Sequence, residues 1–91
     1  MDPNFWQARY LFGGELASEG RIEEAQAQFS EVVRTRPDFA PGHLNDGLAL
    51  AKSGKLDEAL KEFQITLHLN PTNLVAQQNL EAIRALKIRR Q

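Results

Sequence analysis

Two ten-residue stretches of this chain share one sequence motif: GRIEEAQAQF at residues 20–29 and GKLDEALKEF at residues 54–63. Each opens with glycine, a basic residue, an aliphatic residue and two acids, and each ends with alanine and phenylalanine four positions apart. When the sequence is shifted by 34 residues, residues 13–37 match residues 47–71 at eight of 25 positions. A period of this length is typical of proteins that stack one short structural unit on the next.

Each unit has the pattern of two helices joined by a tight turn. Between Gly54 and Pro71, apolar residues recur every three or four positions and so share one side of a helix. A second apolar stripe ends at Gly54, where glycine suits the left-handed conformation that terminates many helices. We therefore expect five helices, at about 3–19, 22–35, 40–53, 56–69 and 73–88. The predicted fold class is all-α, a right-handed superhelix of antiparallel helix pairs.

Capping residues support the two ends of this arrangement. Asp2 is a candidate N-cap with Pro3 at the first helical position, and Asn73 is a candidate cap for the last helix. The last segment carries one apolar stripe on an otherwise polar helix and ends in basic residues. We expect it to cover the end of the stack as a lid.

The repeated unit resembles the tetratricopeptide repeat (TPR), whose 34 residues carry W-x2-L-G-x2-Y, then A-x3-F, then P. The second and third parts are complete in both copies, and the glycine of the first part is kept; the matching residues are Gly13, Ala25, Phe29, Pro37, Gly47, Ala59, Phe63 and Pro71. The first part departs elsewhere, because Arg9 and His43 replace the tryptophan, Leu16 and Leu50 replace the tyrosine, and Asp46 replaces the leucine. The resemblance covers about residues 6–73.

This resemblance implies one TPR domain over residues 1–91, with repeat one at about 6–39, repeat two at about 40–73 and a capping helix at about 74–91. It also implies a concave groove that holds a peptide or helix of a partner protein. Carried over by position, the groove residues are Tyr10, Gly14, Ala17, Leu44, Asn45, Leu48, Ala51, Lys52, Gln78, Asn79 and Ala82. Tyr10, Gly14 and Val75 stand where chaperone-binding members have lysine or asparagine, so we expect no recognition of chaperone tails.

Composition limits the other functions. The chain has 91 residues, is 42% hydrophobic and 25% charged, has a net charge of −1 and contains no cysteine. The nearly neutral net charge does not indicate a basic surface for nucleic acid, and no apolar run approaches the ~18 residues of a membrane span. His43 and His68 have no ligand-like spacing to one another, and no catalytic motif is present. We expect a cytoplasmic protein that is not an enzyme and uses no metal, cofactor, nucleic acid or membrane.

Two alternatives stay open beside the partner-binding module. The first predicted helix carries Phe5, Trp6, Tyr10 and Phe12 with no preceding unit to cover them, which favours self-association as a homodimer or scaffold. The other alternative is that the chain is a fragment of a longer TPR array. Asp46, on the inner side of its helix, is expected to find a local arginine or solvent rather than a partner.

Overall fold

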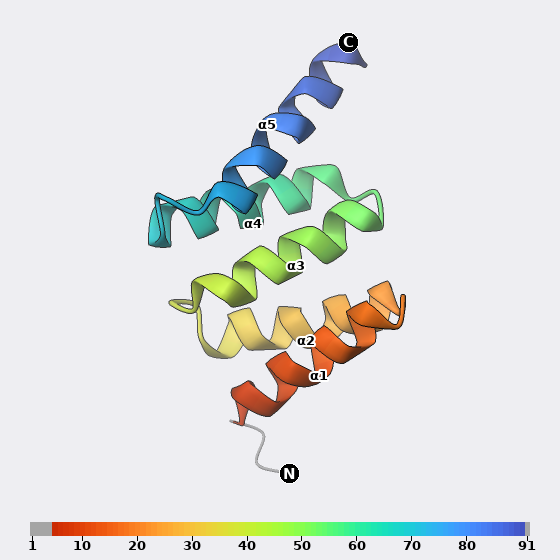
Figure 1. Ribbon diagram of the computed structural model, residues 1–91, viewed down its shortest axis with the longest axis vertical. Helices are drawn as coiled ribbons and strands as arrows, with labels where there is room; N and C mark the ends of the chain where they lie inside the picture. The colour runs from red at the N-terminus through yellow and green to blue at the C-terminus, as the bar shows by residue number, and fades with distance from the viewer. Residues whose placement is uncertain (1–4, 91) are drawn as a thin grey trace.

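The computed structural model describes residues 5–90 and shows five α-helices joined by short turns, with no strand in that range (Figure 1). The helices are α1 Trp6–Ser18, α2 Ile22–Thr35, α3 Ala40–Lys52, α4 Leu56–Leu69 and α5 Leu74–Arg89. Successive helices run antiparallel and stack in chain order along the longest dimension of 46 Å. The predicted all-α solenoid is confirmed.

The predicted helix bounds hold at both ends of α2 and α4. Helix α1 begins later than the predicted residue 3, because Phe5 precedes its first turn and caps it without a side-chain hydrogen bond. The caps predicted at Asp2 and Pro3 lie outside the described residues. At α5 the predicted cap is confirmed, since the Asn73 side chain accepts a hydrogen bond of 2.9 Å from the backbone N–H of Ala76.

The turns inside the two helix hairpins are built alike. Gly20 and Gly54 have φ of +81° and +80°, a conformation that glycine adopts without steric cost. The next backbone N–H then turns back into the helix, from Arg21 to the Leu16 carbonyl and from Lys55 to the Leu50 carbonyl, each at 2.9 Å. These bonds satisfy carbonyls that the helix end would otherwise leave unpaired.

A phenylalanine fits against a glycine in each hairpin. A Cβ placed on Gly13 would lie 2.7 Å from Cε1 of Phe29, and one on Gly47 would lie 2.8 Å from Cε1 of Phe63. Both contacts are closer than real side chains allow, so glycine is needed for the two helices to approach. The glycine and the phenylalanine of the repeated motif therefore form one packing device.

The hydrophobic core consists of two clusters, each built around one of these two phenylalanines. Phe29 is buried with Leu16, Ala25 and Ala49, so it joins the first hairpin to α3. Phe63 anchors a larger cluster that joins the second hairpin to α5; its other buried members are Leu50, Ala59, Ala76, Leu80 and Ile83. Helix α5 buries one stripe and exposes the rest, as expected of a lid. None of the described helices combines the length and the hydropathy needed to cross a membrane.

Candidate functional site

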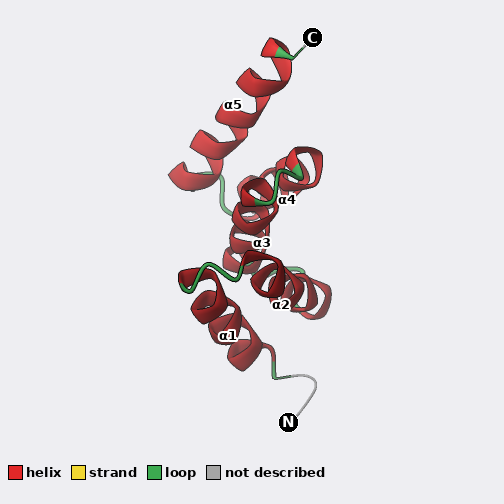
Figure 2. Ribbon diagram, turned by 90° about the vertical axis from the view of Figure 1, so that its right-hand side faces the viewer, coloured by secondary structure: helices red, strands yellow, loops and turns green. Residues whose placement is uncertain are grey.

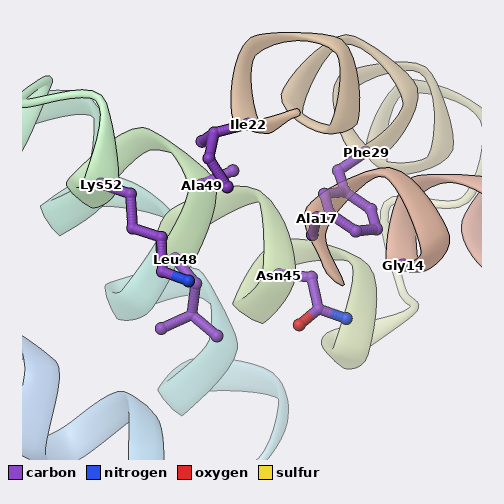
Figure 3. A pocket seen from close by; sticks show the side chains of 8 residues that line it. All are labelled: Gly14, Ala17, Ile22, Phe29, Asn45, Leu48, Ala49 and Lys52. Carbon is purple, nitrogen blue, oxygen red and sulfur yellow. The ribbon is translucent and has the colours of Figure 1, made fainter. Parts of the chain in front are cut away.

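A hollow opens between α1, the start of α2 and α3. Figure 2 shows that α1 and α5 project to the same side of the stack, with α3 between them, so this side is concave. The hollow measures about 200 Å³. It is lined by Gly14, Ala17, Ile22, Phe29, Asn45, Leu48, Ala49 and Lys52 (Figure 3).

Small residues on α1 keep this hollow open. A Cβ on Gly14 would meet no atom within 4 Å, and Ala17 adds only a methyl group to the same wall. Phe29 and Ala49 are buried residues of the first core cluster, so the base of the hollow is rigid and apolar. The hollow therefore presents an apolar base that is open to the outside.

A polar pair lies beside the hollow. The Asn45 side-chain amide donates a hydrogen bond of 2.9 Å to the Tyr10 hydroxyl, which ties α3 to α1. The Tyr10 ring is held in turn by Phe29, at 6.0 Å between centroids, and by Phe39, at 5.1 Å and edge-on. Within residues 5–90, Asn45 Oδ1 has no hydrogen-bond partner. The Tyr10 hydroxyl oxygen accepts the bond from Asn45, so its O–H group can still donate a hydrogen bond. The pair thus offers one acceptor and one donor.

The rim of the hollow carries a cation. The exposed Lys52 has no carboxylate within 4.0 Å in the described part of the chain, and it lines the hollow at the end of α3 (Figure 3). An ammonium in this state is available to an acidic group of a ligand.

The predicted groove residues divide into two sets. Asn45, Leu48 and Lys52 line the hollow, and Tyr10 is bonded to Asn45 beside it. The predicted residues Gly14 and Ala17 also line the hollow, whereas the remaining predicted residues do not. Leu44 packs against the core cluster that contains Phe63, and Gln78 is exposed on α5. The Asn79 side chain donates a hydrogen bond of 2.8 Å to the Val75 carbonyl of its own helix.

Three residues of the hollow were not among the predicted groove residues: Ile22, Phe29 and Ala49. Phe29 matches the repeat motif, and its ring serves both the core and the base of the hollow. Ile22 enters because the tight turn at Gly20 brings the start of α2 beside the end of α1. The signal in the sequence was the conserved spacing between that glycine and the aliphatic residue two positions later, which recurs at Leu56.

Asp46 points away from the hollow, toward α2. It is 4% exposed and accepts a hydrogen bond of 3.0 Å from the Gln26 side chain, rather than meeting the expected arginine or solvent. Burial raises the pKa of Asp46 to about 6, although the hydrogen bond from Gln26 opposes this shift. Asp46 is therefore part of the α2–α3 junction and not of the concave surface.

His43 is also buried, with both ring nitrogens bonded. Nδ1 lies 2.7 Å from Oε1 of Glu62 on α4, and Nε2 lies 2.8 Å from the Pro37 carbonyl. Both partners are acceptors, so the ring makes both bonds as a donor only when it is protonated. The sequence did not indicate this pair, because Glu62 is 19 residues away. Among residues 5–90, no three histidine, aspartate or glutamate side chains form a group that could hold a metal ion.

The aromatic residues of α1 are not equally exposed. Trp6 packs on Phe39 at 4.7 Å between ring centroids and lies under the Arg36 guanidinium at 5.0 Å, and Tyr10 is held as described above. Phe5 and Phe12 are 52% and 50% exposed. The predicted self-association surface therefore keeps two exposed members, and the neighbouring Leu11, 67% exposed, joins them.

The stacked helix hairpins with one concave side define an α-solenoid, a class of repeat proteins. No family model matches the chain. A solved structure entitled "YrrB: a TPR protein with an unusual peptide-binding site" is 29% identical and superposes with a TM-score of 0.78, covering 86% of this chain and 40% of that one. The first TPR of Spaghetti (RPAP3), bound to the HSP90 peptide SRMEEVD, is 23% identical with a TM-score of 0.89, covering 94% of this chain and 69% of that one.

Curated relatives agree with the structures. Uncharacterized protein MJ0572 of Methanocaldococcus jannaschii is 31% identical over 65 residues, which is 69% of this chain and 76% of that protein. DnaJ homolog subfamily C member 3 of Homo sapiens is 32% identical over 71 residues, or 78% of this chain. The match spans only 14% of that human relative. The chain belongs to the tetratricopeptide repeat family.

Proposed function

We propose that this chain is a non-catalytic interaction module that holds a peptide or helix of a partner protein on its concave side. The observation that carries the proposal is the hollow between α1 and α3. An apolar cavity of about 150 Å³ accepts a benzene ring, so a hollow of about 200 Å³ suits one aromatic or branched aliphatic anchor. Such anchors dominate the binding energy of most protein interfaces.

The polar groups around the hollow suit the main chain of an extended peptide. Each peptide unit offers one N–H and one C=O, and the Asn45–Tyr10 pair offers one acceptor and one donor. Lys52 would meet an acidic side chain or a terminal carboxylate at the rim. We therefore propose an anchor over Phe29, main-chain bonds at Asn45 and Tyr10, and an acidic group at Lys52. Leu44, Leu48, Gln78 and Asn79 would border the rest of the segment.

The structural neighbours support this proposal. One is described as having a peptide-binding site and the other as bound to an HSP90 peptide. In the present chain, Tyr10, Gly14 and Val75 replace the lysine and asparagine side chains that we expect a chaperone tail to require. A partner other than a chaperone tail is therefore proposed.

The proposal is tested by selecting ligands from a displayed library of random peptides on the immobilised full chain. We expect selected peptides to share one aromatic or aliphatic residue with an acid nearby, and to bind the free chain in calorimetry. Lys52→Glu should weaken that binding roughly tenfold, because it replaces attraction with repulsion at the rim. The same substitution at the exposed Lys61 of α4 is the matched control and should change nothing.

Leu48→Glu should abolish binding, whereas Leu69→Glu, on α4 outside the hollow, should not. Circular dichroism of each variant separates lost binding from lost folding. Peptides that bind both variants of each pair equally well would overturn the groove as the site. A library that yields no binder would overturn the peptide-binding function.

A further inference from the structure

The 34-residue period shows which face of α1 is left uncovered. The positions one period after Ala8 and Phe12 are Gly42 and Asp46, and in α3 both are buried against α2. A Cβ on Gly42 would lie 3.1 Å from Cγ1 of Val32, and Asp46 bonds to Gln26. The same face of α1 lies at the end of the stack, where no described helix covers it (Figure 1).

This end face is apolar at its centre. Phe5 and Phe12 expose about half of their side chains and the adjacent Leu11 exposes two thirds. No other part of α1 exposes aromatic rings in this way, because Trp6 and Tyr10 turn inward onto Phe39. Exposed apolar residues that gather on one face usually mark an interface.

The other end of the stack, on α5, is less apolar than this face. One and two periods after Gly13 and Leu16, which contact α2, stand Gly47 and Leu50, then Glu81 and Arg84 on α5. Glu81 and Arg84 are exposed there, and Leu74 and Ile88, seven residues to either side of Glu81, are exposed on the same side, so the free side of α5 mixes charged and apolar residues. Head-to-tail stacking of two copies would place the rings against this mixed surface and would leave an open chain of copies. Pairing of α1 with α1 of a second copy places apolar rings against apolar rings and closes after two copies.

The charges beside Phe12 favour the same pairing. Arg9 and Glu15 lie three residues before and three residues after Phe12, so an antiparallel α1–α1 pair centred on Phe12 sets Arg9 of each copy opposite Glu15 of the other. In the described chain Arg9 bonds only to Gln28, at 3.2 Å, and the Glu15 carboxylate has no partner.

Glu15 also argues against a further helix stacked as α2 stacks on α3. One period after Glu15 stands Ala49, which is 4% exposed. A helix packed in the same way on α1 would bury the Glu15 carboxylate and would have to supply its partner, since an unpaired buried carboxylate is costly. A second copy instead supplies the arginine.

We propose that the outer face of α1, formed by Phe5, Leu11 and Phe12, docks a second copy of this chain in a twofold antiparallel pair. Phe12 lies at the axis, and reciprocal Arg9–Glu15 ion pairs flank it. None of the residues that line the hollow belongs to this contact, so each copy in the dimer is expected to keep its own peptide site free. Pairing would then present two hollows at once, which raises the avidity for any partner carrying two copies of the recognised segment.

Sedimentation of the full chain over a hundredfold range of concentration tests the proposal. We expect a monomer–dimer equilibrium with a concentration-dependent melting temperature. Phe12→Asp should raise the dissociation constant of the dimer about tenfold or more, because it places two carboxylates at the axis. Ile88→Asp, at a residue of α5 that is 69% exposed, is the matched control and should leave the dimer intact.

A charge exchange distinguishes this geometry from other contacts. Arg9→Glu and Glu15→Arg should each weaken the dimer, and the double variant should restore it, because the reciprocal pairs re-form with inverted sign. A monomer at the highest concentration would overturn the proposal and leave the face to a different partner. A dimer that survives Phe12→Asp, or single charge variants that the double variant fails to rescue, would also overturn it.

Discussion

Two helix junctions of this molecule occupy equivalent positions and are built from opposite chemistry. Where α4 meets α5, Leu60 packs against the apolar cluster that contains Leu80, and an exposed ion pair of Lys87 with Asp57 lies outside this cluster. Where α2 meets α3, the residues one period earlier are Gln26 and Asp46, joined by a buried hydrogen bond. The arrangement of the helices differs as well, because α5 is inclined more steeply to α4 than α3 is to α2 (Figure 1).

The difference between the two junctions distinguishes the residues that determine the fold from the residues that can vary within it. The residues shared by both hairpins are the small and aromatic ones that determine how closely helices approach. The position held by Gln26 or Leu60 is not constrained in this way and tolerates an amide or an aliphatic side chain. A buried polar pair usually stabilises less than the apolar residues it replaces, so the α2–α3 junction should be the weaker one.

The largest expected effect tests whether the second cluster is the stronger core. Phe63→Ala should lower the free energy of unfolding by roughly 2–4 kcal/mol, because it leaves a cavity against Gly47 in a cluster of six buried residues. Phe29→Ala should cost about 1 kcal/mol less, since the Phe29 ring already borders an open hollow. Urea denaturation measures both, with the exposed Lys61→Ala as a control that should stay within about 0.5 kcal/mol. Equal losses at the two phenylalanines would contradict the ranking.

The second prediction concerns variants in which the α2–α3 junction is given the residues of the α4–α5 junction. Gln26→Leu alone should destabilise by roughly 1–3 kcal/mol, because Asp46 stays buried without its donor. The double change of Gln26→Leu with Asp46→Leu should recover wild-type stability or exceed it, since both positions then match α4 and α5. Thermal melts of the two variants decide the matter. A double variant as unstable as the single one would show that the junctions are not interchangeable.

The smallest expected effect is a pH dependence confined to the polar junction. Burial raises the pKa of Asp46 from 3.8 to about 6, with Gln26 on α2, His43 on α3 and the carboxylates of Glu58 and Glu62 on α4 as its charged or polar neighbours. The folded protein therefore holds this proton more tightly than the unfolded chain. Its contribution to stability is present at low pH, is lost as the pH rises through about 6, and stays lost above that value.

Asp46→Asn removes this titration and gives the matched comparison. The stability of Asp46→Asn relative to the wild type should increase by roughly 1 kcal/mol between about pH 5 and pH 7.5. Melting curves of both proteins across that range measure the difference. A constant difference between them would mean that the Asp46 carboxyl does not titrate in this window.

The fold was accessible from the sequence because its determinants repeat. Gly20 and Gly54 mark the turns, and the two alanine–phenylalanine pairs mark the contacts, so each feature is supported by its own copy. The start of α1 was misplaced because the prediction followed Pro3 and not the repeat, in which Trp6 stands one period before the start of α3 at Ala40. Pro3 suggested a helix start that the structure places at Trp6.

The site was only partly accessible, because its polar contacts join residues that no local pattern relates. Asn45 and Tyr10 were both assigned to the groove, but their mutual hydrogen bond spans 35 positions. The Glu62 partner of His43 and the Gln26 partner of Asp46 come from neighbouring helices in the same way. Periodicity shows which side of a helix a residue occupies, whereas the pairing of side chains across helices depends on rotamers that sequence does not specify.

The zigzag path of the chain has a kinetic consequence. Substantial packing occurs only between successive helices, from α1 with α2 through to α4 with α5. Contacts are therefore close in sequence, and chains of low contact order fold quickly, because no distant segments must find one another before native contacts form. In the monomer, opening should begin where a helix has a neighbour on one side only, so the amides of α1 and α5 should exchange with solvent before those of α3.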